Sequence, residues 1–170
     1  SIVMSREKLL VVIDPTAAEQ PAMLQGLKLS RLLDCDLELL ICHYDSLFAG
    51  RDFLAGAERE AVREQSLSHQ LGYLKSLRDT LAADDVRVTV RAVWDKPLAD
   101  AIVRVTLREQ PRLVLTDTHH HTTIARTLFT ITDWQLIRSL PTPLWLVKQG
   151  TDPDKSVLAA VDPSHEHDKP

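Results

Sequence analysis

The sequence lacks an excess of positive charge and any long apolar run. Its 20 Lys and Arg residues face 24 Asp and Glu, which gives a formal net charge of −4 and a pI near 5.9. Proteins that bind nucleic acid or anionic membranes usually present a basic surface, and this charge balance predicts none. No apolar stretch approaches the roughly 20 residues of a membrane-spanning helix. We therefore expect neither nucleic acid nor a membrane as a partner.

Cysteine is scarce, with two residues in the chain. Cys35 and Cys42 flank one predicted strand and do not form a C-x-x-C pair. In an extended strand they would lie about 23 Å apart, which is far beyond the reach of a disulfide. This pattern is typical of reduced thiols, and it predicts a cytosolic protein.

Familiar catalytic motifs are also missing. The sequence contains no G-x-S-x-G nucleophile elbow and no constellation of catalytic carboxylates. The run His119-His120-His121 could bind zinc together with His43, since imidazole is a common zinc ligand. Consecutive residues project in different directions, however, and no cysteine or spaced carboxylate completes a ligand set. A polar loop is favoured, and we expect no enzyme, no metal site and no cofactor.

What the sequence does contain is a repeat near its two ends. Residues 8–16 read KLLVVIDPT and residues 156–164 read SVLAAVDPS, so each apolar run ends in Asp-Pro and a hydroxyl residue. A repeat of domain-sized spacing indicates a tandem duplication. We expect one complete domain over residues 5–149 and a linker over 150–154. Residues 155–170 would be the truncated first strand of a second, homologous domain.

Short apolar strands alternate with amphipathic helices along the first domain. The predicted strands are Leu9–Ile13, Leu37–Cys42, Val86–Val93, Leu113–Leu115 and Pro143–Val147. The predicted helices begin near Pro21, after about Gly56, at Pro97 and near Ile131. This order predicts an α/β fold, an open five-stranded parallel sheet with helices on both faces.

The character of each strand predicts its place in the sheet. Leu9–Ile13 is apolar throughout, as in a central strand that is buried on both faces. Val86–Val93 alternates apolar residues with Arg87, Thr89 and Arg91, which predicts an edge strand with one wet face. We expect Leu144–Val147 at the other edge. The apolar segment Val157–Val161 should pair along a sheet edge, either its own or that of a second copy.

Gly26 interrupts the first predicted helix. A glycine inside a helix costs about 1 kcal/mol relative to alanine. We expect it to be compensated by a close approach of this helix to the sheet.

Polar residues follow the predicted strands at their carboxyl ends, where ligands bind in such sheets. They are Asp14, His43 and Thr116–Thr118. Asp14 is open to two readings, because it could contact a ligand or accept hydrogen bonds from its own turn. A phospho-acceptor role like that in receiver domains is disfavoured, since the acidic cluster that would hold Mg²⁺ is missing.

The segment Arg112–Lys148, together with Asp14, resembles the universal stress protein family. Residues 141–148 read PTPLWLVK and match the Pro-x-Pro ending before the family's last strand. Tandem, E-type members share the Val-Ile-Asp-Pro opening, the Thr132-Asp133-Trp134 run and the Trp-x-Val-Lys finish. In single-domain members the last strand commonly forms the dimer edge, which would be Leu144, Trp145, Leu146 and Val147 here.

The chain departs from the family in its nucleotide-binding loop. The three glycines of that loop fall on Asp117, His120 and Thr130, and its hydroxyl residue falls on Ile131. Glycine is needed there because the backbone takes positive φ angles and wraps the phosphates closely. A carboxylate at position 117 would repel a triphosphate, and Ile131 removes a ligand. The aspartate at position 14, which contacts the adenosine part in ATP-binding members, is retained.

Two functions remain open. The first is a non-enzymatic, cytosolic stress-response module that acts through its own second domain, through homodimerisation or through an unidentified small molecule. The second is a divergent adenine-nucleotide-binding regulator that uses Asp14 and the 117–131 loop. Ligand positions would then include His43, Thr116, Asp117, Thr118, His120, Thr130 and Ile131. Without phosphates to order it, Thr118–Thr127 should be mobile or follow a path that forms no phosphate cradle.

Overall fold

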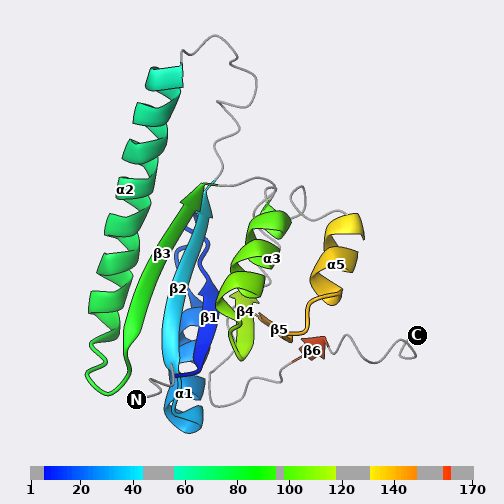
Figure 1. The fold of residues 1–170 in the computed structure, drawn as a ribbon. Coiled ribbons are helices and arrows are strands. Elements are labelled where there is room, and N and C mark those ends of the chain that lie inside the picture. Colours follow the sequence, from blue (N-terminus) through cyan, green and yellow to red (C-terminus); the bar gives the residue numbers. More distant parts are fainter. Residues whose placement is uncertain (1–5, 44–55, 95–97, 118–130, 149–158, 162–170) are drawn as a thin grey trace, which may run out of the picture.

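Helices and strands alternate along the chain in the computed structural model, which describes residues 6–43, 56–94, 98–117, 131–148 and 159–161 (Figure 1). The strands are β1 (Lys8–Val12), β2 (Asp36–His43), β3 (Val88–Trp94), β4 (Leu113–Asp117), β5 (Leu144–Val147) and β6 (Ala159–Val161). The helices are α1 (Pro21–Leu33), α2 (Gly56–Leu81), α3 (Leu98–Glu109) and α5 (Ile131–Arg138). The expected loop 118–127 and linker 150–154 lie outside the described residues.

The strands form one sheet in the order β3-β2-β1-β4-β5-β6. The first five are parallel, which confirms the predicted five-stranded parallel sheet with β1 at its centre and β3 at its edge. β6 pairs with β5 in the antiparallel direction, so that Leu144 lies opposite Val161 and Leu146 opposite Ala159. The C-terminal segment therefore pairs along the edge of its own sheet, one of the two expected arrangements.

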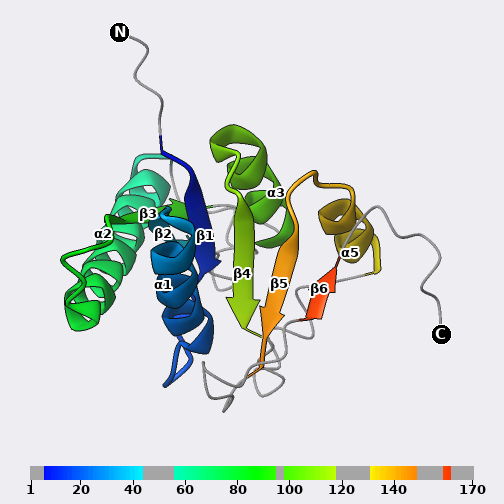
Figure 2. The same cartoon turned by 90° about the horizontal axis from the view of Figure 1, so that it is seen from below.

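Helices cover both faces of the sheet, with α1 and α2 on one side and α3 and α5 on the other (Figure 2). Alternate residues of β1 therefore enter two different cores. Leu9 and Val11 pack with residues of α1 and α2, whereas Leu10 and Val12 pack with residues of α3 and α5. A strand with two dry faces needs apolar residues at every position, which explains the continuous apolar run.

Gly26 allows α1 to approach the sheet closely, as expected. A Cβ atom at this position would lie 2.7 Å from Val11 Cγ2 and 3.1 Å from Leu37 Cδ1. Both neighbours are fully buried, so neither can withdraw into solvent. The missing side chain thus sets the distance between α1 and strands β1 and β2.

The expectation of a wet face on β3 is wrong at Arg91. This side chain is only 28% exposed, because the end of α3 covers it. Its Nε lies 3.0 Å from Oε1 of Glu38 on β2, and its second guanidinium nitrogen donates to Glu109 on α3 at 2.7 Å. The alternating pattern correctly indicated an edge strand, but it could not reveal that a neighbouring helix supplies a partner for the arginine.

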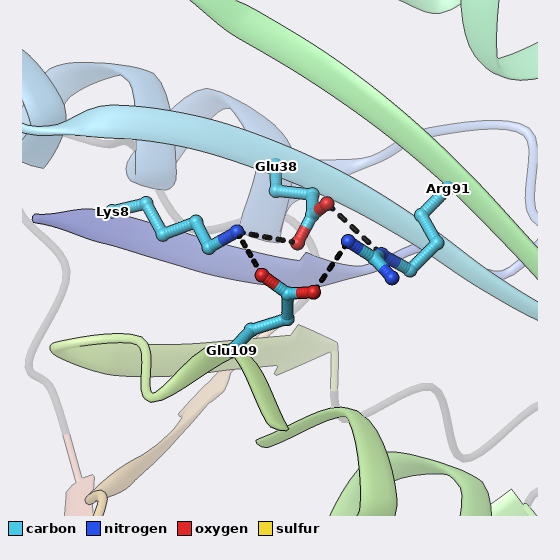
Figure 3. A network of polar contacts seen from close by, with 4 residues as sticks. All are labelled: Lys8, Glu38, Arg91 and Glu109. Carbon is cyan, nitrogen blue, oxygen red and sulfur yellow. Dashed lines mark hydrogen bonds and ion pairs between the residues drawn. The ribbon is translucent and has the colours of Figure 1, made fainter. Parts of the chain in front are cut away.

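Lys8 completes a ring of four alternating charges with Glu38, Arg91 and Glu109 (Figure 3). Its Nζ lies 2.6 Å from Glu109 Oε2 and 3.5 Å from Glu38 Oε2. The Glu38 side chain is 4% exposed, so its charge requires these partners. The ring ties the last residue of α3 to β1, β2 and β3. The hydrogen bond from Lys8, with Arg91 nearby, holds the pKa of Glu109 below its ordinary value.

Within the described part of the chain, no helix is both long enough and apolar enough to cross a membrane. Cys35, which is buried before β2, and Cys42, which is partly buried in it, are not joined in a disulfide.

The close approach at Gly26 predicts opposite effects of Gly→Ala at two helical positions. In Gly26→Ala the new methyl group collides with Val11, and overpacking of this kind costs about 1–3 kcal/mol. Gly72→Ala on α2 is the matched control, since a Cβ there meets nothing within 4 Å and alanine favours the helix by about 1 kcal/mol. Urea unfolding should show the first variant less stable than wild type and the second more stable. Stabilisation by both would contradict the packing described.

The charge ring predicts a stability contribution from Glu109 that depends on pH. Its pKa in the folded chain is lowered from an ordinary value of 4.5, so the folded state favours the charged form. The contribution is complete above that value and is lost as the pH falls through the lowered pKa of the folded state. Glu109→Gln should destabilise by about 1–3 kcal/mol at neutral pH, and this deficit should shrink in acid.

Urea unfolding across the acidic range measures this deficit at each pH. Glu60→Gln, at an exposed position on α2, is the control and should change the free energy of unfolding by less than about 0.5 kcal/mol. A Glu109→Gln deficit that stays constant into acid would show that the ring does not depend on the charge of Glu109.

Candidate functional site

The carboxyl ends of β1 and β4 lie side by side at the point where the strand order reverses. Val12 at the end of β1 is opposite Thr116 of β4. Asp14 follows two residues after Val12, and Asp117 is the last residue of β4. In open parallel sheets, the crevice that binds ligands lies at this position. The topology thus brings Asp14, Thr116 and Asp117 to one edge of the sheet, as expected.

Asp14 is held by its own turn. Its Oδ1 accepts hydrogen bonds from the backbone N–H of Thr16 at 2.9 Å and from the Thr16 hydroxyl at 2.6 Å. Its carbonyl oxygen accepts a bond from Gln20 Nε2 at 2.6 Å. A side-chain oxygen bonded to the backbone two residues later is a common way to stabilise a turn. The turn-forming role of Asp14 is therefore present in the structure.

Asp117 caps the first turn of α1. Its Oδ1 accepts a hydrogen bond from the backbone N–H of Ala22 at 2.8 Å, in a partly buried position. Gln20, the N-cap residue of α1, makes no cap hydrogen bond with its side chain, and Pro21 at the start has no N–H. The acceptor for the Ala22 amide thus comes from β4, 95 residues along the chain.

This capping role was not predicted from the sequence, which identified Asp117 as a replaced glycine and as a ligand position of the alternative function. A signal was available at the start of the predicted helix. The run Gln-Pro-Ala offers none of the Ser, Thr, Asp or Asn residues that usually cap a helix. One of the first amides therefore needed an acceptor from elsewhere in the fold.

Gln20 links the Asp14 turn to the start of α1. The residue is 6% exposed, and its Nε2 donates to the Asp14 carbonyl. Its Oε1 is shielded from solvent and has no hydrogen-bond partner within the ranges that the structure describes. The crevice therefore contains two carboxylates and one buried amide oxygen, contributed by Asp14, Asp117 and Gln20.

The other predicted positions are placed as follows. Thr116 is partly buried, opposite Val12 and Leu146. His43 is the last residue of β2, opposite Trp94, and Ile131 is the first residue of α5. On β5, Leu144 and Val147 are buried, whereas Trp145 and Leu146 are partly exposed. Thr118, His120 and Thr130 lie outside the described residues.

No group of three or more His, Cys, Asp or Glu side chains that could hold a metal ion occurs among the residues described here. The histidine run at positions 119–121 falls outside them. The chemistry that the described crevice offers is hydrogen-bond acceptance by the oxygens of Asp14, Asp117 and Gln20.

Known proteins with similar sequences agree with the resemblance drawn from the motifs. The family model for the universal stress protein family matches residues 5–148. Universal stress protein E of Photorhabdus laumondii is 29% identical over 161 residues, which cover 94% of this chain and 51% of that protein. The chain spans about half the length of the curated relatives it matches.

Solved structures share the fold of this chain. A universal stress protein crystallised in complex with cAMP superposes with a TM-score of 0.53 at 14% identity, covering 85% of this chain and 98% of that one. A functionally unknown protein from Pseudomonas aeruginosa gives a TM-score of 0.59 at 19% identity, covering 86% of this chain and 44% of that one. At such identities these structures support the fold alone. With a parallel sheet of the expected order and a family match over residues 5–148, the chain belongs to the universal stress protein family.

Proposed function

We propose that this chain is a non-enzymatic, cytosolic stress-response domain of a tandem protein. In this proposal the domain has lost the ATP-binding loop of its family. It acts instead as an interaction module or as a binding module for a small molecule other than a nucleotide. The kinship with universal stress protein E supports the stress-response role.

The hydrogen bond between Asp117 and Ala22 is the observation that carries this proposal. Position 117 is the first of three at which ATP-binding members of the family have glycine. The carboxylate at this position is turned toward the start of α1, and a phosphate group approaching the same helix start would meet a like charge. His120, Thr130 and Ile131, the other replaced positions, further weaken any case for a phosphate cradle.

Three observations support partners for the domain. The curated relatives are about twice as long as the matched chain, which fits a second, homologous domain in the whole protein. The repeat of the β1 sequence at residues 156–164 points the same way. β5, the last of the five parallel strands, pairs with β6 in the antiparallel direction. Its edge is therefore also suited to pairing with a strand of a second copy of the chain.

A divergent adenine-nucleotide-binding regulator is the alternative function. It is favoured by the retention of Asp14 at the end of β1 and by the fold shared with a universal stress protein solved with cAMP. The ligand would then contact Asp14 and Thr116 together with the loop of residues 117–131.

Adenine nucleotides should give little thermal stabilisation of the wild-type chain. A ligand at 100 times its Kd stabilises by about 2.7 kcal/mol, which would raise the Tm of a domain of this size by roughly 5–10 °C. We expect a Kd for ATP, ADP, AMP and cAMP weaker than about 100 μM. At about 100 μM ligand the shift should then stay below roughly 2 °C.

Asp14→Asn is the matched control for this measurement, because asparagine keeps an oxygen acceptor for the Thr16 turn. A large nucleotide-induced shift that is present in wild type and lost in Asp14→Asn would favour the nucleotide-binding alternative. Calorimetry giving a Kd of a few micromolar for any of these nucleotides would overturn the proposed loss of nucleotide binding.

The edge of β5 should become available when β6 is removed. A chain ending at Gly150 lacks Ala159–Val161, and the backbone groups of β5 that pair with this segment would lose their partners. We expect the shortened chain to form dimers at lower concentration than the full 170-residue chain. Light scattering over a concentration series measures this. If the shortened chain and the 170-residue chain both stay monomeric at all concentrations, the assignment of β5 as an interaction edge is contradicted.

A further inference from the structure

At the amino end of α1, a backbone N–H group donates its hydrogen bond to a carboxylate of the same chain. Met23 and Leu24 donate their backbone N–H groups to the Gln20 carbonyl. Pro21 has no N–H, and Ala22 donates to Asp117 at 2.8 Å. A helix start carries a partial positive charge, and free amides at this end commonly bind phosphate or other anions. Here a side chain fills the place that a ligand anion would take.

The position of this carboxylate follows from the packing of α1. Gly26 brings the helix against Val11 and Leu37, and a Cβ at position 26 would also lie 3.9 Å from Leu115 on β4. Two residues after Leu115, the chain reaches Asp117. The close packing of α1 therefore places its first turn within hydrogen-bond reach of the end of β4.

The negative charge of Asp117 lies where solvent screens it poorly. Its bond to Ala22 is partly buried, and its Oδ2 is shielded from solvent. Charges interact more strongly in such surroundings than in open water. An incoming phosphate would have to displace a tethered carboxylate from the Ala22 amide and would be repelled by it.

We propose that Asp117 determines which class of ligand this crevice accepts. It occupies the anion position at the start of α1, excludes phosphate-bearing molecules and leaves the crevice to uncharged or cationic ones. This inference rests on the proposed function, because it concerns the same crevice and supplies a cause for the loss of nucleotide binding.

The test follows the backbone amide of Ala22 by ¹⁵N NMR while inorganic tripolyphosphate is added. In wild type this amide should not respond up to about 10 mM tripolyphosphate, which corresponds to negligible affinity. In Asp117→Ala the amide loses its acceptor, and tripolyphosphate should then titrate it with an affinity at least about tenfold higher. The Tm of this variant should fall by roughly 2–4 °C through loss of the cap.

Asp84→Ala is the matched control. It removes the same charge from an exposed bend before β3 and should leave the Ala22 amide and its response unchanged. Asp117→Asn is the second variant, because it keeps an oxygen acceptor for Ala22 and should fold even where alanine does not. Its Tm should lie within roughly 2 °C of the wild-type Tm, and it should bind tripolyphosphate more tightly than wild type does.

The proposal is overturned if tripolyphosphate moves the Ala22 amide as readily in wild type as in the variants. It is equally overturned if neither Asp117→Ala nor Asp117→Asn binds tripolyphosphate better than wild type. Failure of the proposed function looks different. Wild-type protein would bind ATP with a Kd of a few micromolar, and the proposal about Asp117 would then fail together with the proposed function. If neither variant gains affinity for tripolyphosphate while wild type binds no nucleotide, the proposal about Asp117 fails alone and the proposed function stands.

Discussion

The contact between α1 and the central strands at Gly26 positions most of what lies at the candidate site. With hydrogen in place of a side chain, the helix backbone packs directly on Val11 and Leu37. This fixes the first turn of α1 beside the carboxyl ends of β1 and β4. Asp117 can then reach the Ala22 amide, and Gln20 can reach the Asp14 carbonyl. One close approach thus connects the core of the domain to the polar groups of its crevice.

The described polar groups of this domain are largely engaged with one another. At the carboxyl ends of the strands, Asp14 stabilises its own turn and Asp117 caps α1. Near the amino end of β1, Lys8 takes part in a ring of four charges that anchors the end of α3 to three strands. Carboxylates used in this way contribute to stability and to the geometry of the fold, and they are poorly placed to bind phosphate.

The sequence predicted the fold well because local pattern and burial agree along the strands. The continuous apolar run at Leu9–Ile13 identified the central strand, and the alternation before Trp94 identified the edge. The role of Gly26 was also predictable, since a glycine inside a helix needs a compensating contact. The partners of Arg91 and Asp117 could not be predicted in this way. Each hydrogen bond joins residues far apart in sequence, and no local period records which helix end will lie over which strand.

Native mass spectrometry of the protein purified from cells, with no ligand added, tests the central claim most directly. The claim is that this crevice does not take phosphate-bearing molecules, because Asp117 already supplies the anion at the start of α1. The account predicts the mass of the chain alone, or of the chain with an uncharged or cationic small molecule. A stoichiometric complex with AMP, ADP, ATP or another phosphate-bearing compound would contradict it.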